Sequence, residues 1–201
     1  MAVAVFLAAL AGVPAALADG DPASDYLFTA QVFLPYDAKV PAAQQQQLTS
    51  LVADANRAGF PIRVAVIWSN YDLGSITSLW RKPRTYARFL GAELTFGYKQ
   101  RLLIVMPNGF GFNWPKHAPT AEYATLAKIP VTPTPSGLVA AAQTAVQRLA
   151  AARGVKLIPG HATGTSSNRH DRTIIIIAAV AAFAVATFLR LILRGRRRRD
   201  P

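Results

Sequence analysis

Cysteine is absent from this chain of 201 residues, and acidic residues are scarce. Without cysteine the protein forms no disulfide, binds no metal through thiolates and has no thiol nucleophile. The 10 Asp and Glu face 22 Lys and Arg, so the formal net charge is +12. So few acids are a poor source of the several oxygen ligands that a calcium or magnesium site needs. Any folded part of the chain therefore depends on an apolar core.

Recognisable catalytic and phosphate-binding motifs are missing as well. There is no Gly-x-Ser-x-Gly elbow and no P-loop lysine motif. The sequence Gly109-Phe110-Gly111 lacks the third glycine and the helix start of a dinucleotide site. His117 has no acid beside it to complete a catalytic triad. We therefore name no catalytic residue and expect no nucleophilic catalysis.

The positive charge is unevenly distributed along the chain. Residues 19–168 hold 14 Lys and Arg against 8 Asp and Glu, and the rest of the excess lies after residue 168. No stretch of residues 19–168 alternates basic residues with stacking aromatics, as proteins that bind single-stranded nucleic acid do. The net charge alone is a poor argument for a nucleic-acid partner, and we expect none.

The strongest signal is an apolar run at residues 174–193, broken only by Thr187 and Arg190. Twenty helical residues rise about 30 Å, which matches the hydrocarbon core of a bilayer. Arg190 costs at most about 3 kcal/mol of insertion, and near the helix end its side chain reaches the headgroups. We predict one transmembrane helix at residues 173–193, and hence a lipid bilayer as a partner.

A cluster of arginines follows this run at once. Five arginines lie within six residues, and such an excess marks the cytoplasmic flank of a transmembrane helix. We predict a basic cytoplasmic tail at residues 194–201 and an N-terminal domain outside, in a single-pass protein of the cell membrane. The tail should also attract anionic lipid headgroups. The predicted membrane-anchoring residues are Arg190, Arg194, Arg196, Arg197, Arg198 and Arg199.

The N-terminus is typical of a secretion signal. Residues 3–17 are apolar and rich in alanine, and Ala16-Leu17-Ala18 fits a small-x-small cleavage site. We predict a signal peptide at residues 1–18, cleaved after Ala18. The usual basic start is missing, because the first Lys or Arg is Lys39. An uncleaved first helix therefore remains an alternative.

Residues 19–159 have the length of one domain. Their apolar periodicity alternates between strand and helix, and the strand at 61–69 is apolar on both faces, as central strands are. The predicted fold class is α/β, with a sheet of mostly parallel strands covered by helices on both faces, plus the one C-terminal transmembrane helix. Residues 160–172 are predicted to be a flexible tether. The predicted ranges are a strand or extended segment at 25–34, strands at 61–69 and 101–106, helices at 41–58, 83–94 and 137–153 (capped by Ser136), a short helix at 122–128 and an edge strand at 155–158.

This order of elements resembles the TPM-domain family. The resemblance rests on an Ile-Arg-Val-Ala-Val-Ile strand and a later Leu-Leu-Ile-Val strand ending near glycine, and it covers about residues 32–149. Members are exported or lumenal α/β domains, often tethered by a transmembrane helix, and include phosphatases and assembly or repair factors. The resemblance implies a hairpin partner after the strand at 101–106 and Ca²⁺ or Mg²⁺ as candidate cofactors. The acids that the family has near its glycine turn have no counterpart at residues 109–116.

Within that resemblance, Asp37 and Asp72 are the candidate ligands for a divalent cation. Asp72 follows the central strand, on the rim where α/β folds place ligands. Two scattered acids do not make a calcium or magnesium cage, which needs more oxygens. The alternative is that both aspartates form turns and cap helices.

An aromatic, glycine-containing stretch at residues 110–115 is the most unusual local feature. If its side chains are exposed, they mark an interaction site. Arg81, Lys82, Arg84 and Arg88 would then give a basic rim for anionic headgroups or cell-wall polymer. The alternative is a set of core aromatics beside a solvated helix face. The predicted partner- or ligand-binding residues are Trp80, Arg81, Phe110, Phe112 and Trp114.

These observations favour a membrane-tethered extracytoplasmic module for binding or assembly in a bacterial envelope, and we expect it to be non-catalytic. Its partner would be an unknown envelope protein. One alternative is a divalent-cation-dependent phosphatase of the TPM type, which needs Asp37 and Asp72 to converge. Another is a glycan-binding module for the cell wall, which needs Trp80 or Trp114 exposed in a groove.

Overall fold

A computed structural model of the protein describes residues 20–35 and 37–157. The predicted signal peptide, the whole of the predicted tether, the predicted transmembrane helix and the basic tail with its arginines lie outside these ranges. Among the helices of residues 20–35 and 37–157, none is long and apolar enough to cross a membrane.

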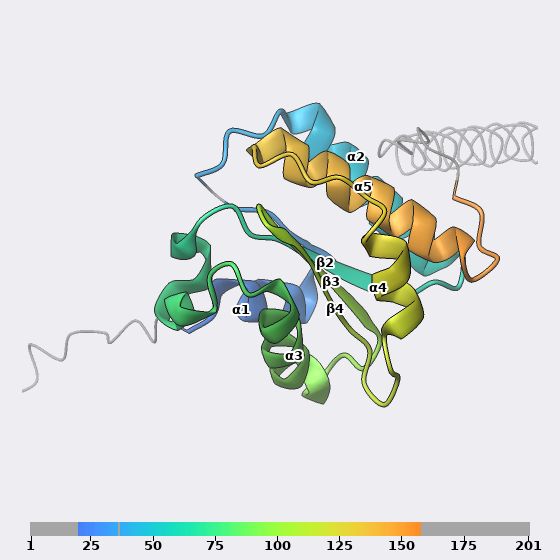
Figure 1. The fold of residues 1–201 in the computed structure, drawn as a ribbon, viewed down its shortest axis with the longest axis horizontal. Helices are drawn as coiled ribbons and strands as arrows, with labels where there is room; N and C mark the ends of the chain where they lie inside the picture. The colour runs from blue at the N-terminus through green and yellow to red at the C-terminus, as the bar shows by residue number, and fades with distance from the viewer. Residues whose placement is uncertain (1–19, 36, 158–201) are drawn as a thin grey trace, which may run out of the picture. The chain divides into compact units, whose positions relative to one another are not determined.

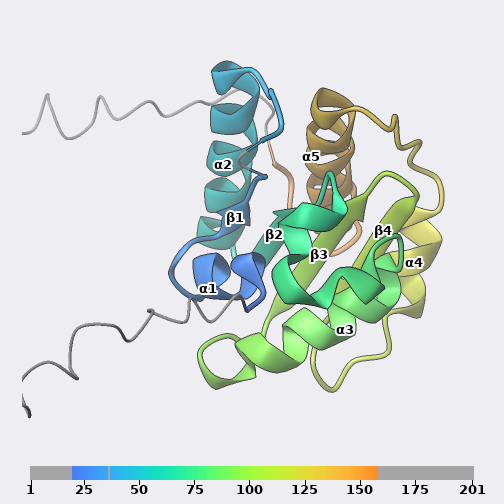
Figure 2. The same ribbon diagram turned by 90° about the vertical axis from the view of Figure 1, so that its left-hand side faces the viewer.

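The centre of the domain is a four-stranded sheet in the order β1-β2-β3-β4 (Figure 2). The first three strands run parallel, with Val64 of β2 paired to Val32 and to Leu103. The fourth strand pairs antiparallel with β3 across a two-residue turn. The strands are β1 (Val32–Phe33), β2 (Ile62–Val66), β3 (Arg101–Met106) and β4 (Gly109–Asn113).

Helices cover both faces of this sheet (Figure 1). On one face, α2 and α5 pack over Val64, Val66 and other side chains of the larger apolar core. On the other, α1 and α3 pack over Ala65 and Ile67 in a second core. The mixed α/β prediction is confirmed. The helices are α1 (Pro22–Thr29), α2 (Ala42–Arg57), α3 (Pro83–Glu93), α4 (Thr120–Leu126) and α5 (Pro135–Ala151), with the 3₁₀ segments η1 (Asn70–Leu79) and η2 (Leu94–Phe96).

The predicted strand at residues 25–34 is mostly wrong. Asp21 caps a helix there, because its carboxylate accepts a hydrogen bond from the backbone N–H of Ala23 at 3.1 Å and Pro22 fits the first helical position. Only Val32 and Phe33 remain as strand. The expected edge strand is also wrong over residues 155–157, which form no strand.

The helix caps follow local chemistry. Gly59, just after α2, has φ +84°, a left-handed conformation that glycine adopts without strain. The predicted cap of α5 was Ser136, but Thr134 takes this role, because its hydroxyl accepts from the N–H of Gly137 at 3.0 Å. Pro135 then occupies the first helical position, where its missing N–H costs nothing.

Strand β4 lies unusually close to α3. A Cβ on Gly111 would stand 1.9 Å from the carbonyl oxygen of Pro83, and one on Gly91 would stand 2.0 Å from the side-chain amide of Asn113. The two glycines therefore allow backbone and helix to approach each other. This approach fixes the start of α3 beside the edge of the sheet.

Candidate functional site

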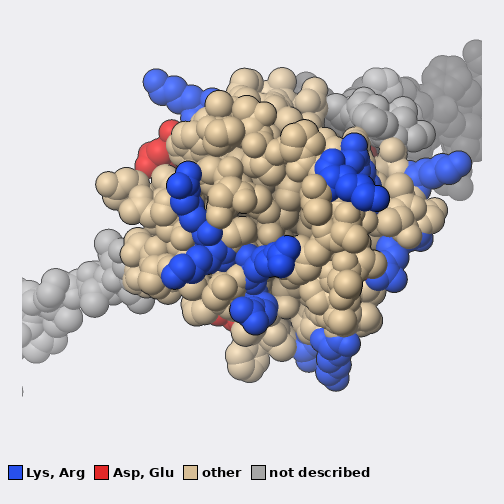
Figure 3. Space-filling view, viewed as in Figure 1, with Lys and Arg blue, Asp and Glu red and all other residues tan. Residues whose placement is uncertain are grey.

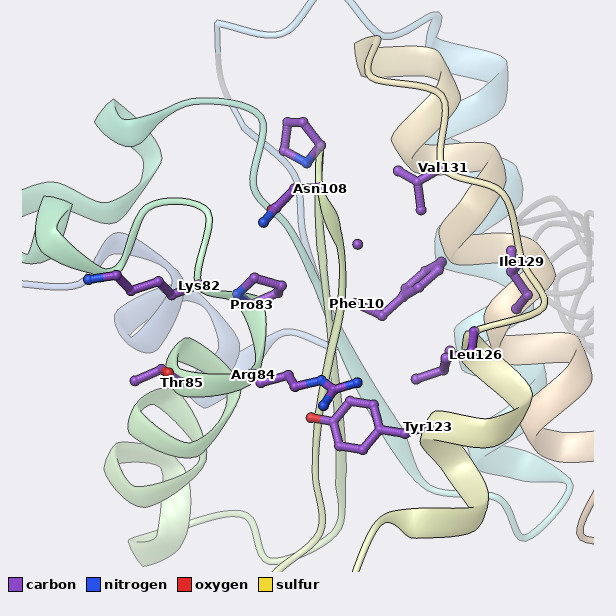
Figure 4. A pocket seen from close by; sticks show the side chains of 13 residues that line it. Lys82, Pro83, Arg84, Thr85, Asn108, Phe110, Tyr123, Leu126, Ile129 and Val131 are labelled. Atoms are coloured by element: carbon purple, nitrogen blue, oxygen red, sulfur yellow. The ribbon is translucent and has the colours of Figure 1, made fainter.

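A groove with a cavity volume of about 690 Å³ lies at the β4 edge of the sheet. The start of α3, the β3–β4 turn, α4 and the segment after α4 enclose it (Figure 4). This volume is within the range of ligand-binding clefts, roughly 300–1,000 Å³. The groove is the candidate site because it brings together three parts of the chain that are far apart in sequence.

The two walls of the groove differ in chemistry. Lys82 and Arg84 come from the start of α3, and no Asp or Glu lines the groove. Leu126, Ile129 and Val131 form the opposite, apolar wall, and Figure 4 shows the two groups on opposite sides of the strands. Cations without a nearby carboxylate keep their charge available to a ligand, so the groove suits an anion that also has an apolar part.

The basic rim predicted from the sequence is present. Arg81, Lys82, Arg84 and Arg88 are all exposed, and Figure 3 shows Lys and Arg side chains gathered near the middle of this face. The side-chain amide of Asn108 donates to the carbonyl oxygen of Arg81 at 2.7 Å, which ties the rim to the β3–β4 turn. The rim is therefore held beside the groove by a long-range contact.

Helix α4 closes one end of the groove through Tyr123. Its hydroxyl accepts from the N–H of Phe112 at 2.9 Å and donates to the carbonyl oxygen of Phe112 at 3.1 Å. The guanidinium of Arg84 lies 4.4 Å from the centre of the Tyr123 ring, a cation–π contact across the groove. An ion pair of 2.7 Å between Arg153 and the buried Glu122 holds α4 against the end of α5.

The predicted aromatic cluster is not an exposed surface. Phe112 is 1% exposed and lies in the larger core, which agrees with the alternative of a core aromatic. Phe110 is 8% exposed and also packs in that core, yet it lines the groove. Trp80 is half-buried against the second core, and Arg81 is exposed at the rim.

Trp114 is stacked on both faces. The Arg101 guanidinium lies 4.0 Å from its ring centre, and the His117 ring lies parallel to it at 3.6 Å. Two groups this close to one ring centre must occupy opposite faces. Arg101 also contacts the Phe60 ring at 4.4 Å. Neither face of Trp114 is free to stack on a sugar in this arrangement.

Asp72 acts as a local cap. One of its carboxylate oxygens accepts from the backbone N–H groups of Trp68 and Ser69, both at 2.7 Å. Burial raises the pKa of this carboxyl, and the charge of Asp37 adds to the rise. Asp37 is exposed beyond β1. Within residues 20–35 and 37–157, no three His, Asp or Glu side chains are grouped as a metal site.

Sequence reasoning missed a buried polar pair in the second core. Asp21 is 5% exposed, and the Tyr86 hydroxyl donates to its two carboxylate oxygens at 2.8 and 2.9 Å. Burial raises the pKa of Asp21 to about 6, while the hydrogen bond from Tyr86 opposes that rise. Burial and the Asp21 charge also raise the pKa of the Tyr86 phenol, so it stays a donor. The turn-prone Asp-Gly-Asp-Pro sequence was the available signal for the cap.

Sequence reasoning also missed the apolar wall and Tyr123. Leu126, Ile129 and Val131 lie just before and at the start of a proline-rich stretch. The prolines exclude a central strand, but they do not show which surface the stretch borders. The short helix predicted at residues 122–128 was the only signal for this wall.

Comparisons with known proteins give little further information. No known family profile matches the sequence, and no curated protein matches it. Among solved structures, the chain is similar to the N-terminal domain of the cg2496 protein from Corynebacterium glutamicum, an NMR structure. The TM-score is 0.41 at 11% identity, over 68% of this chain and 84% of that chain.

Proposed function

We propose that this protein is a membrane-tethered binding or assembly module of a bacterial envelope, and that the groove beside β4 is its ligand site. The observation that supports this most is the lining of the groove: Lys82 and Arg84 face an apolar wall, with no carboxylate among the lining residues. Such a site favours ligands with a negative charge next to an apolar group. The residues that line the groove include no Asp, Glu, His or Ser.

The membrane attachment in this proposal comes from the sequence. The apolar run at residues 173–193 and the arginines after it support a single span with the domain outside and the tail in the cytoplasm. A tether of 13 residues, at most about 3.6 Å each, would span at most about 47 Å between the domain and the predicted transmembrane helix. The ligand would then be found at or near the membrane.

The two alternatives have less support. The antiparallel pair of β3 and β4 agrees with the hairpin that the resemblance to TPM-domain proteins implied, and so favours the TPM-type phosphatase. However, one carboxylate oxygen of Asp72 is occupied by two backbone N–H groups. The glycan-binding module loses Trp114 as a platform, because Arg101 and His117 cover its ring.

The test uses the full chain in detergent and a pair of small probes, 2-naphthyl phosphate and neutral 2-naphthol. Calorimetry should detect binding of the phosphate and about tenfold weaker binding of the naphthol, because only the phosphate pairs with the cations. The double variant Lys82→Glu/Arg84→Glu should lose the phosphate binding. The control Lys99→Glu/Lys156→Glu makes the same change in net charge at exposed positions away from the groove, and it should keep the binding.

Equal binding by both double variants would contradict the groove as the site. Adding Ca²⁺ or Mg²⁺ to the same sample tests the phosphatase. Heat of cation binding, a raised melting temperature and release of fluorescent 2-naphthol would together favour the enzyme over the binding module.

A further inference from the structure

One residue of β4, Phe110, has a backbone N–H and C=O that point away from the sheet at the groove. The carbonyl oxygen of Val105 accepts from the N–H of Ile67 at 2.9 Å, so the backbone groups of Val105 point toward β2. Val105 is the partner of Phe110 in the antiparallel pair. Phe110 is therefore in a non-hydrogen-bonded pair, and its N–H and C=O point away from β3. Within the described part of the chain, neither group bonds to another residue.

The next outward-pointing residue on this edge is already capped. Backbone direction alternates along a strand, so Phe112 points outward like Phe110. The hydroxyl of Tyr123 satisfies both backbone groups of Phe112. The edge is thus closed at Phe112 and open at Phe110, which lines the groove.

Strand β4 has none of the usual features that prevent pairing with another strand. Its sequence Gly-Phe-Gly-Phe-Asn contains no charge and no proline, whereas exposed edge strands commonly use both. Its pairing with β3 is regular through all five residues, with no bulge. The open part of the edge can therefore accept another extended chain.

The walls of the groove define what such a chain should contain. Successive side chains of a strand point to opposite faces of the sheet. An added strand would direct one set toward Lys82 and Arg84 and the other toward Leu126, Ile129 and Val131, which lie on opposite sides of the strands in Figure 4. Acidic residues match the first wall and apolar residues the second.

We propose that the groove binds an extended peptide segment in which acidic and apolar residues alternate, added to β4 as a fifth strand through the backbone of Phe110. This inference rests on the proposed function, because it names the ligand class of the same groove. Main-chain hydrogen bonds supply affinity in this mode of recognition, and the side chains on alternate positions supply specificity.

The test is calorimetric titration of the full chain with a capped six-residue peptide of alternating glutamate and valine. Three further peptides serve as comparisons: one with lysine in place of glutamate, one with the two residue types in scrambled order, and one N-methylated at every second residue so that its inward N–H groups are lost. We expect the first peptide to bind and the three others to bind at least about tenfold more weakly. The N–H of Phe110 should become protected from hydrogen exchange when the first peptide is bound.

Variants test both walls. Val131→Glu, which places a charge against the valine side chains of the peptide on the apolar wall, should reduce peptide binding, as should Lys82→Glu/Arg84→Glu. Lys99→Glu/Lys156→Glu should not. The melting temperature of each variant shows whether the domain is still folded.

The outcomes separate the two proposals. If the N-methylated or scrambled peptide binds as tightly as the first, or if 2-naphthyl phosphate or anionic vesicles bind and no peptide does, strand addition is overturned and the groove remains an anion site. If neither peptides nor 2-naphthyl phosphate bind, both proposals fail. Protection of Phe110 that depends on the first peptide alone supports strand addition.

Discussion

At the scale of single residues, the most consequential feature is a carboxyl group buried in the second core. Asp21 caps α1, and its two carboxylate oxygens share the one hydroxyl proton that Tyr86 donates, so it connects the first helix to α3. Removing a charged carboxylate from water is costly, and the raised pKa of Asp21 reflects that cost. The aspartate cap could be guessed from Pro22, but the partner 65 residues away could not.

Asp21 makes the stability of the domain depend on pH. Its pKa is about 6 in the folded domain, against an ordinary aspartate value of 3.8. Because folding raises the pKa, protonation favours the folded state. The contribution is fully present below the unfolded value and is lost as pH rises through about 6, and it amounts to at most about 3 kcal/mol. The melting temperature should therefore rise between pH 7 and pH 5.

Asp21→Asn is the matched variant for this prediction. Asparagine still caps a helix and accepts from Tyr86, but it does not titrate. The rise in melting temperature from pH 7 to pH 5 should be smaller in the variant than in the original chain. An identical rise in both would assign the pH dependence to other groups, among them Asp72, whose pKa is also raised by burial.

At the scale of elements, the periodicity of apolar residues and the positions of Pro and Gly predicted the main helices and strands well. The ranges for α2, β2, α3 and β3 agree with the structure to within a few residues, because each has a clear apolar pattern and a Pro or Gly at or near one of its ends. Strand β4 was not assigned from its residues, since Gly-Phe-Gly-Phe does not show the alternation of polar and apolar residues typical of a half-buried strand. Its partner β3 and the packing of α3 on Gly111 determine it.

The N-terminal cap of α5 differs between the sequence prediction, Ser136, and the structure, Thr134. Thr134→Ala should lower the free energy of unfolding by about 1 kcal/mol, because it removes the hydroxyl that accepts from Gly137. Ser136→Ala should have a much smaller effect. Urea denaturation of both variants gives the comparison, and a larger loss for Ser136→Ala would contradict the assigned cap.

The contact between β4 and α3 gives a second prediction at this scale. Gly111→Ala should cost about 1–3 kcal/mol or more, because its Cβ would meet the backbone oxygen of Pro83 at 1.9 Å. Gly91→Ala should cost less, since its obstacle is the side chain of Asn113, which can change rotamer. Thermal unfolding measures the loss of stability in both variants. Equal losses would contradict this prediction, because they would mean that β4 and α3 move apart and relieve the contact with the Pro83 backbone.

At the scale of the whole molecule, the groove could not be read from the sequence. It combines residues 82–85, residues 107–110 and, from α4 onward, Tyr123, Leu126, Ala127, Ile129 and Val131, and only the folded chain brings these together. The basic residues near Trp80 were recognisable as a cluster, whereas the apolar wall had no pattern of its own. Phe110 was identified for the wrong reason, as part of an exposed aromatic surface.

The absence of cysteine allows a direct test of the predicted orientation in the membrane. Ser166→Cys and Asp200→Cys each introduce the single thiol of an otherwise cysteine-free chain. In intact cells, a maleimide that does not cross membranes should label Ser166→Cys, and should label Asp200→Cys only after the cells are lysed. The reverse pattern would overturn the orientation, and labelling of both in intact cells would overturn the single span.

The hydroxyl of Tyr123 also affects whether copies of the domain associate with one another through the edge of β4. If the domain is tethered as proposed, many copies would share a thin layer above the bilayer. There, an uncovered strand edge would allow neighbouring copies to pair into growing, amyloid-like sheets. Because Tyr123 occupies the backbone of Phe112, a neighbour finds only one open residue at that edge. A single phenolic oxygen therefore limits self-association while leaving room for a short guest.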